Sequence, residues 1–122
     1  MNISTQLNSV ISASNIKTGI ANIFVQHTSA SLILCENADP TVRRDLEAFM
    51  SKVTPDGDPL YQHTDEGPDD MAAHVRTVLT DSSLNIPFQA GQLLLGTWQG
   101  VFLWEHRVQP HKRQIIVSLY GE

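Results

Sequence analysis

The final third of the chain consists of apolar segments joined by very short polar turns. The segments are "SLNIPF", "QLLLGTW", "VFLWEHRV" and "KRQIIVSLYG", and they are separated by Gln-Ala-Gly, Gln-Gly and Gln-Pro-His. Turns of this kind connect neighbouring antiparallel strands. This part of the chain is therefore expected to form an antiparallel sheet.

The first part of the chain contains one helical and one strand-like pattern. Helical spacing predicts a short N-terminal helix with Ser4 or Thr5 as its cap, and its apolar face consists of Ile3, Leu7, Val10 and Ile11. "GIANIFVQHTSASLILCEN" predicts strand, because Ile23 and Val25 alternate with small or polar residues and "SLILC" is a buried type of apolar run.

Two further helices are expected in the middle of the chain. "DPTVRRDLEAFMSKV" predicts a helix with Asp39 as its N-cap and Pro40 in the first helical position. Another helix is expected from Pro68 to Leu79, with His74 at the edge of its apolar stripe. The first of these helices has one apolar face, which consists of Val42, Leu46, Phe49, Met50 and Val53. The residues of the second helix that are expected to face inward are Met71, Val75, Val78 and Leu79.

Length and composition indicate one domain over residues 1–122. The order of the expected elements indicates the α+β class, in which strands dominate and two or three helices pack against them. The 8 Lys and Arg against 13 Asp and Glu argue against nucleic acid as a partner, so a bound anion needs a local basic pocket. No stretch resembles a membrane span or a signal peptide, which predicts a cytoplasmic protein. Cys35 is the single cysteine, which excludes an intrachain disulfide and a cysteine-based zinc site.

Three histidines are expected at a strand end, in a loop and on a helix: His27, His63 and His74. Three imidazoles can hold a divalent metal such as zinc or magnesium and leave one position open for water or substrate. Their spacing matches no short metal signature. Metal ligation and a polar pocket of hydrogen-bonded histidines both remain open.

Carboxylates gather at the starts of the two central helices: Glu36, Asp39, Glu66, Asp69 and Asp70. Helix capping explains Asp39. Asp69 and Asp70 together exceed what one helix start needs, so one of them is expected to face a histidine, a metal or a bound amine. The candidate catalytic residues are His27, His63, His74, Glu66 and Asp70.

A second group of residues is expected to bind substrate. Thr28, Ser29 and Ser31 follow His27 but lack the glycine pattern of a nucleophile elbow, so they are interpreted as anion donors. Strand alternation places Glu105 and Arg107 on one face with Val101 and Leu103, as an inward ion pair or as part of a basic pocket with Arg113. The candidate substrate-binding residues are Thr28, Ser29, Asp69, Trp98, Gln99, Glu105, Arg107 and Arg113.

The motifs "QHTSASLILCENADPTVRRDLEAF", "YQHTDEGPDDMAAHVR", "GTWQGVFLWEHR" and "KRQIIVSLYGE", in this order, resemble the YjbQ-like family. The resemblance covers nearly the whole chain and implies an antiparallel β-sandwich decorated by helices, a homotrimer, and a site that gathers His27, His63 and His74. Family members usually have another strand before the first helix, so the domain over residues 1–122 is expected to lack that strand.

The resemblance also implies a secondary thiamine-phosphate synthase activity, which joins a pyrimidine diphosphate to a thiazole phosphate. The expected ligand is then a small phosphorylated or heterocyclic metabolite. No diphosphate-binding aspartate motif is evident, which argues against an efficient dedicated synthase. A non-catalytic trimer that binds a metal or a metabolite is the alternative.

Overall fold

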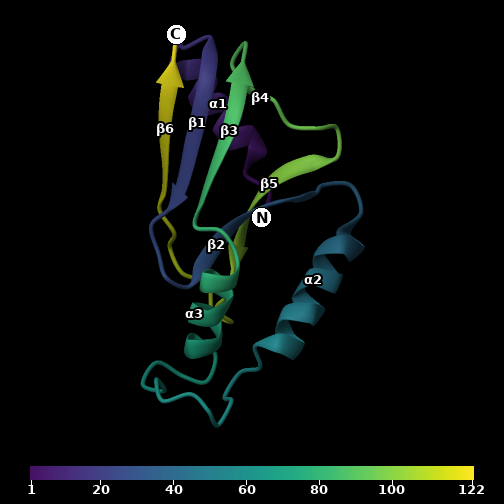
Figure 1. Cartoon of the computed structure of the whole chain (residues 1–122), viewed down its shortest axis with the longest axis vertical. Helices are drawn as coiled ribbons and strands as arrows, with labels where there is room; N and C mark the ends of the chain where they lie inside the picture. Colours follow the sequence, from purple (N-terminus) through teal and green to yellow (C-terminus); the bar gives the residue numbers. More distant parts are fainter.

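The computed structural model describes residues 1–122 and contains three helices and six strands (Figure 1). This confirms the expected α+β class and single domain. The elements are α1 (Ser4–Ala13), β1 (Thr18–Val25), β2 (Ala30–Glu36), α2 (Pro40–Val53), α3 (Asp70–Leu79), β3 (Ser83–Gln89), β4 (Gln92–Leu93), β5 (Gln99–Glu105) and β6 (Ile115–Gly121). No helix has the length and apolar character needed to cross a membrane.

The strands form two antiparallel sheets. The larger sheet has the order β4-β3-β1-β6, and the smaller one pairs β2 with β5. The β3–β4 turn uses Ala90 and Gly91 with positive φ values of 53° and 78°, as a tight hairpin requires. Figure 1 shows the long strands β6, β1 and β3 side by side, with α3 near the lower end of this sheet.

One core lies between the two sheets and α1. Ile23 and Val25 of β1, Phe88 of β3 and Leu32 of β2 are fully buried, and Ile11 of α1 packs against them. Period-two alternation buries every second residue of β1, as the sequence predicts. Since residues of both sheets share this core, the arrangement is that of a sandwich.

Helix α1 occupies the predicted place but begins differently. Leu7 and Ile11 are buried, whereas Val10 is about half exposed. Neither Ser4 nor Thr5 caps the helix; instead the Asn2 carboxamide oxygen accepts the Ser4 backbone N–H at 2.9 Å. Asn2 also bridges to Phe102, so the first residues lie along β5.

Helix α2 begins where the sequence predicts, because Asp39 accepts the Thr41 backbone N–H at 2.9 Å. The apolar face that the sequence gives this helix is largely exposed. Only Met50 is buried, and the Phe49 side chain is 62% exposed. Figure 1 shows α2 at the side of the molecule, apart from the larger sheet, and Leu46, Phe49 and Val53 of its apolar face are exposed.

Helix α3 buries a different face from the one predicted. Ala72, Ala73 and Arg76 are buried, whereas Val78 and Leu79 are exposed. Arg76 points toward α2 and donates to Glu47 at 2.7 Å and to the hydroxyl of Thr54 at 2.9 Å. The buried face of α3 therefore consists of two alanines and the Arg76 network rather than the predicted apolar stripe.

The predicted C-terminal strands are present, with shifted ends. The apolar run "QLLLGTW" forms only the two-residue strand β4 and then leaves the sheet. Strand β5 begins earlier than predicted and ends at Glu105, so His106 and Arg107 lie beyond it. Residues from 106 to 114 form a loop that returns to β6.

Candidate functional site

Three predicted residues meet where the loop before α3 enters the helix. Asp70 is the first residue of α3, and His74 follows one turn later. Asp70 Oδ2 lies 2.7 Å from Nε2 of His63 and 3.3 Å from Nε2 of His74. The ligand atoms of His63, Asp70 and His74 all lie within 4.8 Å of one another. We call these three residues the His63–Asp70–His74 cluster.

Arg107 holds the other side of the Asp70 carboxylate. Its Nη1 donates to Asp70 Oδ1 at 2.9 Å, and its Nε donates to Asp69 Oδ2 at 3.1 Å. The Val108 backbone N–H donates to the same Asp69 oxygen at 2.8 Å. Neither aspartate side chain caps the helix. Asp70 faces the histidines, and Asp69 fixes the position of Arg107.

These contacts set the ionisation of both aspartates. Burial of Asp70 opposes ionisation, but the hydrogen bond to His63 and the charges of His74 and Arg107 outweigh it, so its pKa lies below the ordinary value. The Val108 N–H and Arg107 lower the pKa of Asp69. Both side chains are carboxylates at neutral pH.

The His63–Asp70–His74 cluster has the donor set of a transition-metal site. Two imidazoles and one carboxylate are ligands of zinc, and ligand atoms of a tetrahedral zinc site are about 3.3 Å apart. The separation from Asp70 Oδ2 to His74 Nε2, 3.3 Å, has that value, and the separation to His63 Nε2, 2.7 Å, is the shorter distance of a direct hydrogen bond. Arg107 supplies the outer contact that orients a ligand carboxylate.

His27 lies outside this cluster. It lines a pocket of about 510 Å³ together with Thr28 and His74, which we call the His74 pocket. The Ser29 backbone N–H donates to His27 Nδ1 at 3.2 Å. Because a backbone N–H only donates, the neutral His27 ring carries its proton on Nε2. Desolvation and the charge of Arg113 lower the His27 pKa, which favours this neutral form.

The structure separates the two arginines that the sequence places in one basic pocket. Arg107 contacts Asp69 and Asp70, whereas Arg113 pairs with Glu105 through its Nε at 2.7 Å and through Nη2. The predicted inward ion pair between Glu105 and Arg107 does not form, because β5 ends before Arg107. Glu105 pairs with Arg113 instead. Only the Arg107 backbone N–H reaches Glu105, at 2.9 Å.

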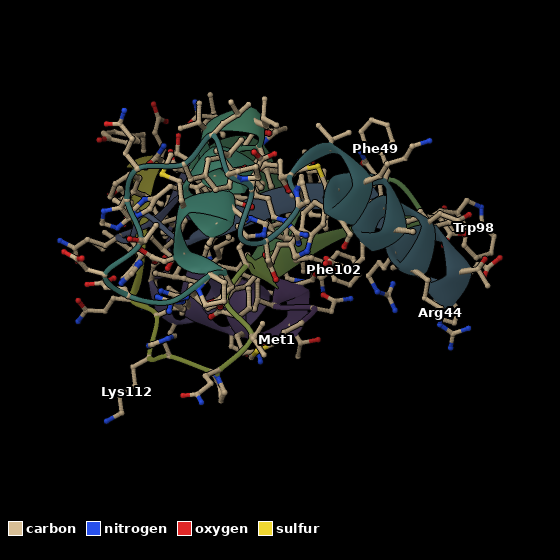
Figure 2. The ribbon with its side chains drawn as sticks, turned by 90° about the horizontal axis from the view of Figure 1, so that it is seen from below. Met1, Arg44, Phe49, Trp98, Phe102 and Lys112 are labelled. Carbon is tan, nitrogen blue, oxygen red and sulfur yellow. The ribbon has the colours of Figure 1, made fainter.

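The remaining candidates fall into two groups. Thr28 and the buried Ser29 lie beside His27, and Glu66 is an exposed side chain 3.9 Å from Arg107 Nη1. Trp98 and Gln99 lie at the opposite end of β5 from Glu105, and Figure 2 shows Trp98 beside α2, near Arg44. The structure does not bring these two residues to the histidines.

Sequence reasoning missed Lys112 and Gln26. Together with His27, Arg113 and Gln114 they line a second pocket of about 550 Å³, which we call the Lys112 pocket. The signal for it is the triplet His111-Lys112-Arg113, a run of basic and imidazole side chains in a chain of net charge -5.

A sequence model of the family described as "UPF0047 protein YjbQ-like" matches residues 1–122. The chain belongs to the YjbQ-like family. Similar members include UPF0047 protein sll1880 of Synechocystis, 51% identical over 99% of this chain and 82% of that protein, and UPF0047 protein YjbQ of Escherichia coli O157:H7, 43% identical over 95% and 83%.

Solved structures of proteins with similar sequences have the same fold. A conserved hypothetical protein of Thermus thermophilus superposes with a TM-score of 0.88 at 35% identity, covering 98% of this chain and 90% of that one. An uncharacterised member from Clostridium acetobutylicum gives 0.88 at 34% identity, covering 98% and 89%. These relatives establish the family and the fold, and their descriptions assign no reaction to them.

Proposed function

We propose that this YjbQ-like protein binds a divalent transition metal, zinc in the first instance, at the His63–Asp70–His74 cluster and acts there on a small phosphorylated or heterocyclic metabolite. One observation carries the proposal: a single oxygen, Asp70 Oδ2, lies 2.7 and 3.3 Å from two imidazole Nε2 atoms. Two imidazoles favour zinc over magnesium, which prefers oxygen ligands.

The chain's own residues would prepare this site for the metal. Arg107 fixes the Asp70 carboxylate so that Oδ2 stays directed at the histidines. The His74 pocket provides a surface of His27 and Thr28 next to the cluster, where a small ligand could reach His74. Bound zinc supplies Lewis-acid polarisation of a ligand oxygen or a more acidic bound water.

The resemblance to the family extends the proposal to a secondary thiamine-phosphate synthase activity. Such a reaction needs cationic groups to stabilise a departing diphosphate. Arg107, the arginine that contacts the His63–Asp70–His74 cluster, is already paired with Asp69 and Asp70, which leaves few cations at the cluster for that task. We therefore expect slow turnover of the pyrimidine diphosphate and the thiazole phosphate, as suits a weak activity.

Zinc binding tests the proposal most directly. Zinc content and affinity would be measured by elemental analysis and by competition with a chromogenic chelator. The His74→Ala variant should lose the metal, while His111→Ala, which removes an exposed histidine outside the cluster, should keep it. Wild-type protein that binds no zinc, or equal losses in the two variants, would refute the proposal.

A non-catalytic metal- or metabolite-binding protein is the second candidate, and the pairing of Arg107 with Asp69 and Asp70 favours it. Assays of the zinc-loaded protein with both thiamine precursors separate the two candidates. Turnover that disappears in His74→Ala supports the enzyme. Tight zinc binding with no turnover supports the binding protein.

The homotrimer implied by the family resemblance is part of the proposal. The exposed apolar side chains of α2 and α3 support association, because exposed apolar surface is typical of an interface. The residues concerned are Leu46, Phe49, Val53, Val78 and Leu79.

A further inference from the structure

The Lys112 pocket differs in character from the rest of this acidic chain. It is lined by Gln26, His27, Lys112, Arg113 and Gln114, and none of these side chains is acidic or apolar. Its two walls are tied together, because the Gln26 backbone N–H donates to the Gln114 carbonyl at 3.0 Å and Val25 pairs with Ile115. The pocket is therefore built on the junction of β1 and β6.

His27 contributes a hydrogen-bond donor of fixed tautomer to this pocket. Its Nδ1 accepts the Ser29 backbone N–H at 3.2 Å and lies 3.1 Å from the Ser29 hydroxyl. The neutral ring therefore carries its remaining proton on Nε2. A histidine that ligates a metal normally donates its second ring N–H to an acceptor, whereas the second nitrogen of His27 faces a donor. This geometry suits recognition of an anion better than ligation of a metal.

Arg113 contributes a second donor, because one end of its guanidinium has no partner. The side chain is 3% exposed, and Glu105 and the Ser29 carbonyl occupy its Nε and Nη2. The buried Nη1 has no hydrogen-bond partner. Leaving a buried charged donor without an acceptor is costly, so an acceptor at this position is favoured. Glu105 lies at the other edge of the guanidinium and leaves Nη1 free.

We propose that the Lys112 pocket binds a small oxyanion, the phosphate group of a metabolite, through Lys112, Arg113 Nη1 and His27 Nε2–H. His27 and Gln26 also line the His74 pocket, so one small molecule can extend from the anion site toward the His63–Asp70–His74 cluster. The anion site itself does not depend on the proposed function. Only the placement of the ligand's other end beside the cluster rests on it. Charge-assisted hydrogen bonds from lysine and arginine are the usual means of holding phosphate.

Binding of inorganic phosphate tests the anion site without any assumption about the natural ligand. Figure 2 shows Lys112 extending from its loop into solvent, so Lys112→Glu should leave the fold intact. We expect this variant to weaken phosphate binding about tenfold in calorimetric or ³¹P NMR titrations. The matched control is Lys52→Glu, which reverses an exposed charge on α2 and should bind as the wild type does. Acetate should bind more weakly than phosphate.

The role of His27 needs its own pair of variants. His27→Ala should weaken phosphate binding several-fold, and His27→Gln, which retains a neutral N–H donor, should recover most of it. Zinc content of both variants should equal that of the wild type, so failure of the zinc site and failure of the anion site are distinguishable. No phosphate binding by the wild type, equal effects of Lys112→Glu and Lys52→Glu, tighter acetate binding, or loss of zinc in His27→Ala would overturn the assignment.

Discussion

Arg107 Nη1 lies 2.9 Å from Asp70 Oδ1, the carboxylate oxygen that does not face the histidines. The contact joins the loop after β5 to the first residue of α3, and Asp69 strengthens it by accepting from Arg107 Nε at 3.1 Å. Because both aspartates hold one guanidinium, the Asp70 carboxylate has a fixed direction. That direction makes Oδ2 available to His63 and His74.

Loss of this contact should weaken the metal site without removing a ligand. We expect Arg107→Gln to lower zinc affinity by about 10- to 100-fold, the usual effect of removing an outer-shell partner. Competition with a chelator at pH 7 measures the change. Arg44→Gln on the exposed side of α2 is the control and should leave the affinity unchanged (Figure 2). Equal affinities of wild type and Arg107→Gln would contradict the assigned role of Arg107.

Local sequence chemistry predicted much of the fold. Asp39 and Pro40 mark the start of α2, and the spacing of Leu7 and Ile11 marks the buried face of α1. These signals depend on neighbours within one or two turns, which the sequence contains. The buried face of α3 was not predictable in the same way, because the partners of Arg76 lie on α2 and at its C-terminal cap, far from Arg76 in the sequence.

The same division applies to the candidate site. His63, Asp70 and His74 were each candidates from the sequence, but their spacing matches no short metal signature, and the predicted metal ligands were His27, His63 and His74. The fold brings Asp70 rather than His27 to the other two histidines. The partners of the two arginines depend on where β5 ends and how the following loop returns to β6. Alternation placed Arg107 on the strand with Glu105, whereas the chain turns there and delivers Arg107 to α3 and Arg113 to Glu105.

Arg76 should be a major determinant of how α2 is attached. Its buried guanidinium donates to Glu47, Ser51 and Thr54, all on α2 or its C-terminal cap. Hydrogen bonds to a charged group contribute about 1.5–3 kcal/mol, so we expect Arg76→Met to lower the free energy of unfolding by about 2 kcal/mol.

Urea denaturation measures that loss, and hydrogen exchange should show faster exchange of Pro40–Val53 than in the wild type. Arg44→Met is the matched control, since Arg44 is exposed on the same helix. A loss of stability no larger than in the control would show that the network is not needed.

The exposed apolar face of α2 predicts the oligomeric state. The Phe49 side chain is 62% exposed, and a charge there should be tolerated by the folded chain but not by an apolar interface. We expect the wild type to be trimeric in light scattering and Phe49→Glu to be a monomer with an unchanged circular dichroism spectrum. Val10→Glu, at an exposed position of α1, is the control. A monomeric wild type, or a trimeric Phe49→Glu variant, would contradict the prediction.

His106 should make the fold sensitive to mild acid. Its Nε2 lies 2.8 Å from the Ser31 hydroxyl in the core, and burial, reinforced by the charge of Arg76, lowers its pKa to about 4. The unfolded chain, with a pKa near 6.5, therefore binds more protons than the folded chain between these two values. The stability that depends on neutral His106 is present above pH 6.5 and is lost as the pH falls toward 4.

From the two pKa values, we expect His106 alone to lower the free energy of unfolding by about 2 kcal/mol when the pH falls from 7 to 5. Urea denaturation at both pH values measures the change. The variant His106→Gln, which retains an amide to contact Ser31 but cannot titrate, should lose about 2 kcal/mol less over the same interval. His111→Gln, which removes an exposed histidine, should behave as the wild type does. The same pH dependence in wild type and His106→Gln would assign acid sensitivity to other groups.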